Sequence, residues 1–223
     1  MSLMFSVFST MESHPDYDFI KAQFQELEKL DNLEKLDSYI ERNQLDSSID
    51  AFYTKYPEVD LRLSQADISE LKSRGIISAD HRLDLQNFPD NPLAKLLAAV
   101  LWKNGDIYKV QHLVDGITGR EGDRTKYSLI LKQYGASLAS EQEPIVDQHV
   151  LRAFEIYSLK EGSFLPVHNL KRKSSYKSSD RPLLNAYKAW FKKVIDKVPK
   201  SEQSDFKEKL DKVLFFLGKK VKV

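Results

Sequence analysis

The chain has 223 residues, of which 41% are hydrophobic and 30% charged, and a formal net charge of +1, which is typical of a globular protein. It contains no cysteine, which excludes disulfides, thiol catalysis, cysteine zinc sites and cysteine-ligated iron–sulfur clusters. No run of eighteen apolar residues occurs, and residues 1–11 are too short, too polar and too poor in basic residues for a secretory signal. We therefore expect a cytoplasmic protein without a membrane span.

The first region, residues 1–89, begins with apolar residues at helical spacing from Asp16 onward. Another helix is expected to start at Asp46 or Ser47, and Pro57 ends it because proline breaks a helix interior.

A short β element near residues 59–86 is predicted next. Its evidence is the alternation of apolar residues in two short stretches, which comprise Val59, Leu61, Leu63, Leu83 and Leu85. Between them a helix is expected, because Ser64 and Asp67 have the spacing of a capping box and Gly75 is a typical helix stop.

The central region, residues 90–160, has the strongest helical patterns. Its first helix is predicted from Pro92 to the stop at Asn104-Gly105, with apolar residues at helical spacing: Leu93, Leu96, Leu97, Val100 and Leu101. Asp106 is expected to cap a second helix that ends at Asp115-Gly116, and a third and a fourth helix are predicted before and after Pro144.

Three stretches of this region resemble the helix-hairpin-helix superfamily of base-excision DNA glycosylases. Residues 146–152, VDQHVLR, resemble the family signature V-D-x-H-[IV]-x-R, and residues 92–106 resemble the apolar helix that opens the family's helical core. Residues 119–135, GREGDRTKYSLILKQYG, loosely resemble the family's hairpin and the helix that follows it.

The resemblance implies that Asp147 is a catalytic carboxylate that supports loss of the base. It also places Arg124 where bifunctional members carry a nucleophilic lysine, and because arginine cannot form a Schiff base, a strand-cutting activity is not expected. From the residues alone, Asp147 has another interpretation, since a carboxylate in the first turn of a helix is typical of a capping residue. Arg152 is expected at the surface or in an ion pair.

The last region, residues 161–223, comprises a basic connector and a C-terminal helical hairpin. Residues 160–223 carry 17 Lys and Arg against 7 Asp and Glu, a net +10, whereas the rest of the chain carries −9. Such asymmetry has two explanations: a surface that faces a polyanion such as DNA, or a basic surface that docks onto the acidic remainder of the same chain. The candidate nucleic-acid contacts are Arg120, Arg124, Lys126, Lys171, Arg172, Lys173 and Lys177.

Taken together, these patterns predict a mainly α protein, a helical bundle-like array with a possible glycosylase-like core. Motifs for nucleotide binding, metalloproteases and serine hydrolases do not occur, and the histidines are dispersed, so no cofactor and no metal are expected. Two functions remain: a non-catalytic helical module that binds nucleic acid or protein, and a monofunctional glycosylase-like enzyme that uses Asp147. The sequence favours the first, because no other catalytic group converges on Asp147.

Overall fold

Helices dominate the computed structural model, which describes residues 15–56, 61–84, 92–120, 128–160 and 176–221. The prediction of a mainly α protein is therefore confirmed. In chain order the helices are α1 (Pro15–Leu27), α2 (Leu33–Arg42), α3 (Asp46–Lys55), α4 (Gln65–Ser73), α5 (Pro92–Lys103), α6 (Lys109–Thr118), α7 (Ser128–Ala139), α8 (Gln148–Tyr157), the short 3-10 helix η1 (Ser178–Asp180), α10 (Arg181–Ile195) and α11 (Gln203–Lys220).

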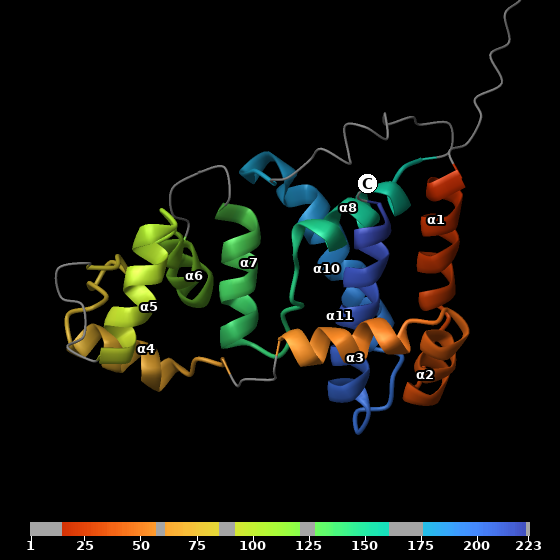
Figure 1. The fold of residues 1–223 in the computed structure, drawn as a ribbon, viewed down its shortest axis with the longest axis horizontal. Coiled ribbons are helices and arrows are strands. Elements are labelled where there is room, and N and C mark those ends of the chain that lie inside the picture. The colour runs from red at the N-terminus through yellow and green to blue at the C-terminus, as the bar shows by residue number, and fades with distance from the viewer. Residues whose placement is uncertain (1–14, 57–60, 85–91, 121–127, 161–175, 222–223) are drawn as a thin grey trace, which may run out of the picture.

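The helices form two lobes along the long axis of the molecule (Figure 1). The small lobe consists of α4, α5, α6 and α7, and the large lobe consists of α1, α2, α3, α8, α10 and α11. The large lobe thus combines the beginning and the end of the chain, and the small lobe is built from its middle.

Helix α8 lies at the centre of the large lobe, and six of its residues are buried. Its Phe154 packs with ring centroids 5.4–6.0 Å from those of Phe24, Tyr157, Tyr187 and Trp190, which joins α1, α8 and α10 through an aromatic cluster. Aromatic pairs at such distances stabilise a core beyond the area that they bury. This core contains residues from each of the three predicted regions.

The capping signals of α4 are confirmed, but the predicted cap of α6 is wrong, because α6 begins at Lys109 with Tyr108, and not Asp106, as its N-cap. Ser64 and Asp67 form the predicted capping box at the start of α4, where each side chain bonds the other residue's backbone amide. Gly75 and Gly105 follow the ends of α4 and α5 in the left-handed conformation, with φ of 70° each, which glycine adopts without steric cost.

The predicted end of α6 is wrong, because the helix continues through Gly116 to Thr118 and stops at Gly119 (φ 67°). Gly116 lies inside the helix where α7 crosses it, and a Cβ atom there would overlap the backbone carbonyl of Lys132. Gly135 of α7 lies equally close to the backbone of Leu113. Glycine therefore serves close helix packing here, and only Gly119 provides the left-handed stop.

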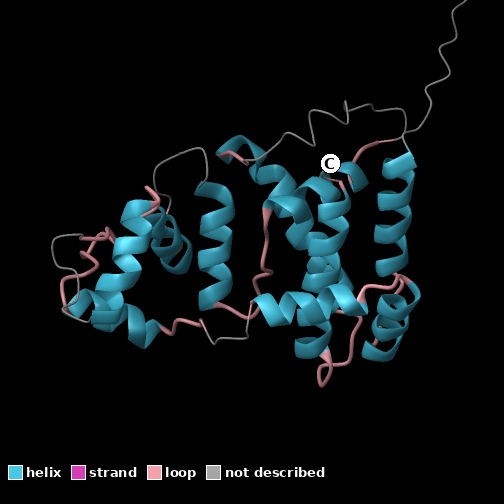
Figure 2. Ribbon diagram, viewed as in Figure 1, coloured by secondary structure: helices cyan, strands magenta, loops and turns pink. Residues whose placement is uncertain are grey.

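The predicted β element is not confirmed. In the described residues 61–84 the only β pairing is an isolated antiparallel bridge between Ile77 and Leu83, and no strand is drawn in Figure 2. The Leu63 amide donates to the Leu138 carbonyl at 2.9 Å, so this segment joins α7 and not a β ribbon. Val59 and Leu85 lie outside the described residues.

None of the described helices is both long and apolar enough to cross a membrane.

Candidate interaction surface

An exposed apolar stripe runs along α5. Leu93, Leu96, Leu97 and Val100 are 63%, 67%, 59% and 59% exposed, and none of the residues of α5 is buried. Their i, i+3, i+4, i+7 spacing places all four on one face of the helix. The sequence places this stripe in the core of the central region, but in the structure it faces away from the protein.

The stripe exposes on the order of 500 Å² of apolar surface, which is the size of the largest patches on monomeric proteins, and such patches are often functional. The side of α5 that faces the protein carries the half-buried residues Ala94, Ala98 and Leu101.

One lysine borders the stripe. Lys95 and Lys103 are the only charged residues of α5; Lys103 continues the row formed by Leu96 and Val100, whereas Lys95 projects to the other side of the helix. Two exposed aromatic residues lie outside the stripe, Trp102 at 70% and Tyr108 at 71% exposure. Trp102 projects to the side of α5 opposite the stripe, because nine residues separate it from Leu93.

Behind the surface, the small lobe contains an apolar cavity of about 260 Å³. The described residues of its wall are leucines, isoleucines and valines of α4, α6, α7 and the segments before and after α4: Leu63, Ile68, Leu71, Ile76, Ile77, Leu83, Val110, Leu113, Val114, Ile117 and Leu138.

Asp147 is the N-cap of α8, as the alternative interpretation of the sequence predicts. Its carboxylate accepts a hydrogen bond from the Val150 amide at 2.8 Å. Burial raises the pKa of Asp147, while that hydrogen bond and the charges of His149 and Arg152 oppose the rise. The capping role is therefore present in the structure, and the catalytic assignment stays a prediction.

The surface position expected for Arg152 is wrong. Arg152 is 1% exposed, and its guanidinium lies 3.4 Å from Nδ1 of His149. It is buried because α8 is enclosed by α1, α10 and α11, so that nearly every side of the helix contacts a neighbour. Its positive charge favours the ionised form of Asp147.

Asp211 of α11 is a second buried carboxyl in this part of the large lobe, and the sequence did not single it out. Burial raises its pKa to about 7, against the nearby charges of Lys207 and Lys212. Burial raises the pKa of the Tyr187 hydroxyl, and the charges of Asp211 and Asp147 raise it further, so the three groups interact electrostatically. The sequence indicates the burial of Asp211 only through its position between Leu210 and Leu214, next to the apolar stripe of α11.

The predicted nucleic-acid contacts are not gathered into one described site. Arg120 is half-buried and pairs with Asp115 at 3.0 Å, so its guanidinium already forms an ion pair within the small lobe. Lys177 is exposed before η1. The other five candidates lie outside the described residues: Arg124, Lys126, Lys171, Arg172 and Lys173.

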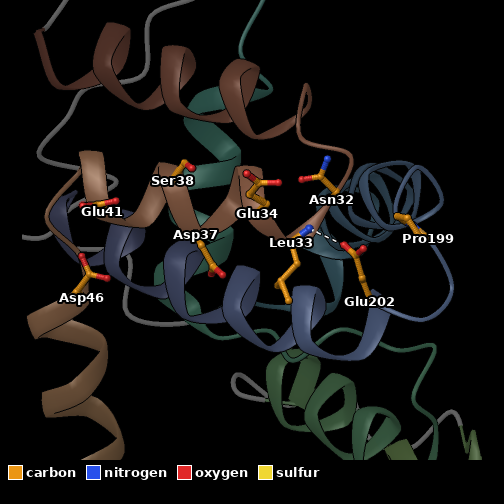
Figure 3. A pocket seen from close by; sticks show the side chains of 9 residues that line it. All are labelled: Asn32, Leu33, Glu34, Asp37, Ser38, Glu41, Asp46, Pro199 and Glu202. Atoms are coloured by element: carbon orange, nitrogen blue, oxygen red, sulfur yellow. Dashed lines mark hydrogen bonds between the residues drawn. The ribbon is translucent and has the colours of Figure 1, made fainter.

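A broad hollow of about 1050 Å³ lies on the large lobe, between α2 and the start of α11 (Figure 3). It is lined by acidic residues, among them Glu34, Asp37, Glu41 and Glu202. Glu202 accepts a hydrogen bond from the Leu33 amide at 2.7 Å, and Asp37 pairs with Lys209 at 2.6 Å. This negative lining disfavours a polyanion, and Asp147 lines neither this hollow nor the apolar cavity.

Metal binding receives no support from the part of the chain that the structure describes. No group of three or more histidine, aspartate and glutamate side chains there is placed to hold a metal ion. Asp115 instead forms ion pairs with Arg120 and Lys132, at 3.0 and 3.6 Å, and its Oδ1 accepts a hydrogen bond from Gln111.

No family model matches the chain, and neither a curated protein nor a solved structure matches it significantly. Function therefore has to be argued from the chain's own residues.

Proposed function

We propose that the protein is a non-catalytic interaction module, which docks an apolar helix of another protein along the exposed stripe of α5. The observation that carries the proposal is the exposure of Leu93, Leu96, Leu97 and Val100 on one face of a helix that has no buried residue. Amphipathic partner helices are recognised through apolar side chains at this spacing.

The charge of α5 defines the partner further. Because Lys103 is the charged residue of α5 that borders the stripe, a partner helix with carboxylates beside its apolar face complements the surface. A second copy of α5 offers no carboxylate to pair with Lys103, so we infer that the partner is a different protein.

The size of the stripe indicates a reversible complex. Standard stable interfaces bury about 800 Å² on each partner, which exceeds the roughly 500 Å² that the four side chains expose. The partner is therefore expected to dissociate readily, as in transient regulatory complexes.

Two amphipathic peptides of roughly eighteen residues test the proposal by titration calorimetry. Both carry leucines at i, i+3, i+4 and i+7, and one has glutamates and the other lysines on its remaining positions. We expect the glutamate peptide to bind at least tenfold more tightly than the lysine peptide, and the variant Leu96→Glu/Leu97→Glu to lose the binding.

The control variant Ala186→Glu/Ala189→Glu adds the same charge at exposed positions of α10 and should bind as the wild type does. All variants should retain the helical circular dichroism of the wild type, because the substituted side chains are exposed. Equal binding by the Leu96→Glu/Leu97→Glu variant, or no saturable binding of the glutamate peptide, would reject the α5 surface. A wild-type dimer in sedimentation that this variant dissociates would make a second copy the partner.

A further inference from the structure

Among the residues that the structure describes, only apolar side chains line the cavity of the small lobe. Its deepest residues are almost completely buried, with Ile68 at 2%, Ile76 at 7%, Ile77 at 1% and Val114 at 5% exposure. Ordered water needs two to four polar partners, and this wall offers none from side chains. A cavity of this kind favours a hydrocarbon over water.

Gln111 of α6, next to the cavity, directs its side-chain amide to the turn after α4 and to Asp115. Gln111 accepts a hydrogen bond from the Leu83 amide at 2.7 Å and donates to the His81 carbonyl and to Asp115, each at 2.9 Å. Asp115 also pairs with Arg120. These bonds fix the turn that carries part of the wall, so the cavity is formed before any ligand binds.

Backbone bonds hold the same turn from its other side. The Ser78 amide donates to the Arg82 carbonyl and the Asp84 amide to the Ile76 carbonyl, both at 2.8 Å. Ile76 and Ile77 are therefore anchored against α4 and α6 and do not depend on a ligand for their position.

We propose that this cavity is a binding site for an uncharged hydrocarbon ligand, or the hydrocarbon part of a larger one, with about ten carbon atoms. The size follows from the volume of about 260 Å³. A dry apolar cavity of about 150 Å³ accommodates one benzene molecule, and simple proportion gives roughly ten carbons here. The site is independent of the α5 surface, because no residue of α5 lines it.

A polar atom inside the cavity would lose its hydrogen bonds to water without replacement. The site should therefore distinguish naphthalene from quinoline, which has the same shape but carries a ring nitrogen. We expect quinoline to bind at least tenfold more weakly.

The isoleucine δ1 methyl groups allow the site to be observed directly in the full chain by ¹H–¹³C NMR. Addition of naphthalene should shift the resonances of the four isoleucines in the wall, Ile68, Ile76, Ile77 and Ile117, in a saturable manner. Ile20 and Ile156 lie in the core of the large lobe and should not shift.

Val110→Trp fills part of the cavity and should abolish these shifts. Ala186→Trp adds the same side chain at an exposed position of α10, in the other lobe, and should leave them unchanged. If Val110→Trp loses the wild-type circular dichroism, Val110→Phe replaces it and should weaken binding by at least threefold. The proposal fails if folded wild-type protein gives no saturable shifts up to the solubility limit of naphthalene, if core isoleucines shift equally, or if the folded cavity variant binds as the wild type does.

Discussion

At the scale of single residues, the carboxyl of Asp211 is held in an environment that disfavours its charge. Burial raises its pKa to about 7, and within the described part of the chain its Oδ1 is buried without a hydrogen-bond partner. The amide of Ile145 and the charges of Lys207 and Lys212 only partly offset the loss of water around the carboxylate.

This pKa predicts a stability that falls as the pH rises. The folded pKa lies above the unfolded value of about 3.9, so the folded state binds the proton more tightly. The stabilisation by the bound proton is complete below about pH 4 and is lost as the pH rises to about 7. The total loss in the free energy of unfolding is roughly 4 kcal/mol, because the folded and unfolded pKa differ by about three units. Asp211→Asn should remove this dependence.

Urea unfolding at pH 4, 5.5, 7 and 8 measures the effect. We expect Asp211→Asn to be more stable than the wild type at pH 8 and close to it at pH 4. Asp196→Asn serves as the control, since Asp196 is exposed and pairs with Lys192 on the surface, which contributes little. An asparagine variant that is less stable at pH 8 would show that the ionised carboxylate is stabilised by its surroundings.

At the scale of single helices, the crossing of α6 and α7 depends on two glycines. Gly116 and Gly135 each lie where a Cβ atom would overlap backbone of the other helix. The sequence offered a different interpretation of Gly116, because glycine after an apolar helical pattern is also a common stop signal. Which role a glycine has depends on the partner helix, and local sequence does not contain that information.

Gly116→Ala should therefore destabilise the protein by about 1–3 kcal/mol, the usual cost of forcing extra atoms into a packed interface. Replacing glycine by alanine at an exposed position inside a helix would instead stabilise the protein by roughly 1 kcal/mol. The sign of the stability change therefore distinguishes a close helix crossing from an exposed position. The measurement is the midpoint and slope of urea unfolding.

Gly105→Ala provides the matched control for this prediction. Gly105 has φ of 70° and no heavy atom within 4 Å of an added Cβ. Alanine there should therefore lower the free energy of unfolding only by the cost of the left-handed conformation, about 1–2 kcal/mol. Loss of close packing also separates the helices, so Gly116→Ala should broaden the NMR signals of α6 and α7, which Gly105→Ala should not. A Gly116→Ala protein as stable as the wild type would contradict the close crossing.

Helix α5 shows how far helical periodicity can be used. The spacing of its apolar residues correctly predicts the helix, its start at Pro92 and its end before Asn104-Gly105. Periodicity identifies side chains that share a face, but it does not tell whether another element covers that face. For this reason the residues of the candidate site could be identified from the sequence, while their exposure could not.

At the scale of the whole molecule, the basic C-terminal region contacts the acidic remainder of the chain. Lys188 pairs with Glu143 and Lys209 with Asp37, each at 2.6 Å, and Lys207 donates to the Glu143 carbonyl at 3.1 Å. These contacts support the intramolecular explanation for part of the charge. They join residues far apart in the chain, so only the folded arrangement of α10 and α11 could reveal them.

The remaining explanation, a contact with nucleic acid, makes a prediction about which lysines matter. Each phosphate contact on duplex DNA contributes about 0.9 to the slope of log affinity against log salt concentration. Replacing Lys171, Arg172 and Lys173 by glutamine should therefore flatten the slope by up to roughly 2.7. Replacing Lys188, Lys207 and Lys209 removes the same charge from groups already held by the protein and should change the slope much less.

Fluorescence anisotropy with a labelled duplex at several salt concentrations measures both triple variants, and circular dichroism verifies their folding. The comparison is sharp because the two variants have the same net charge, so a general electrostatic attraction would weaken equally in both. Equal slopes would show that no defined phosphate contact lies in the connector. If the wild type does not bind DNA at low salt, the basic charge of the C-terminal region serves contacts within the chain or with protein partners, and not with DNA.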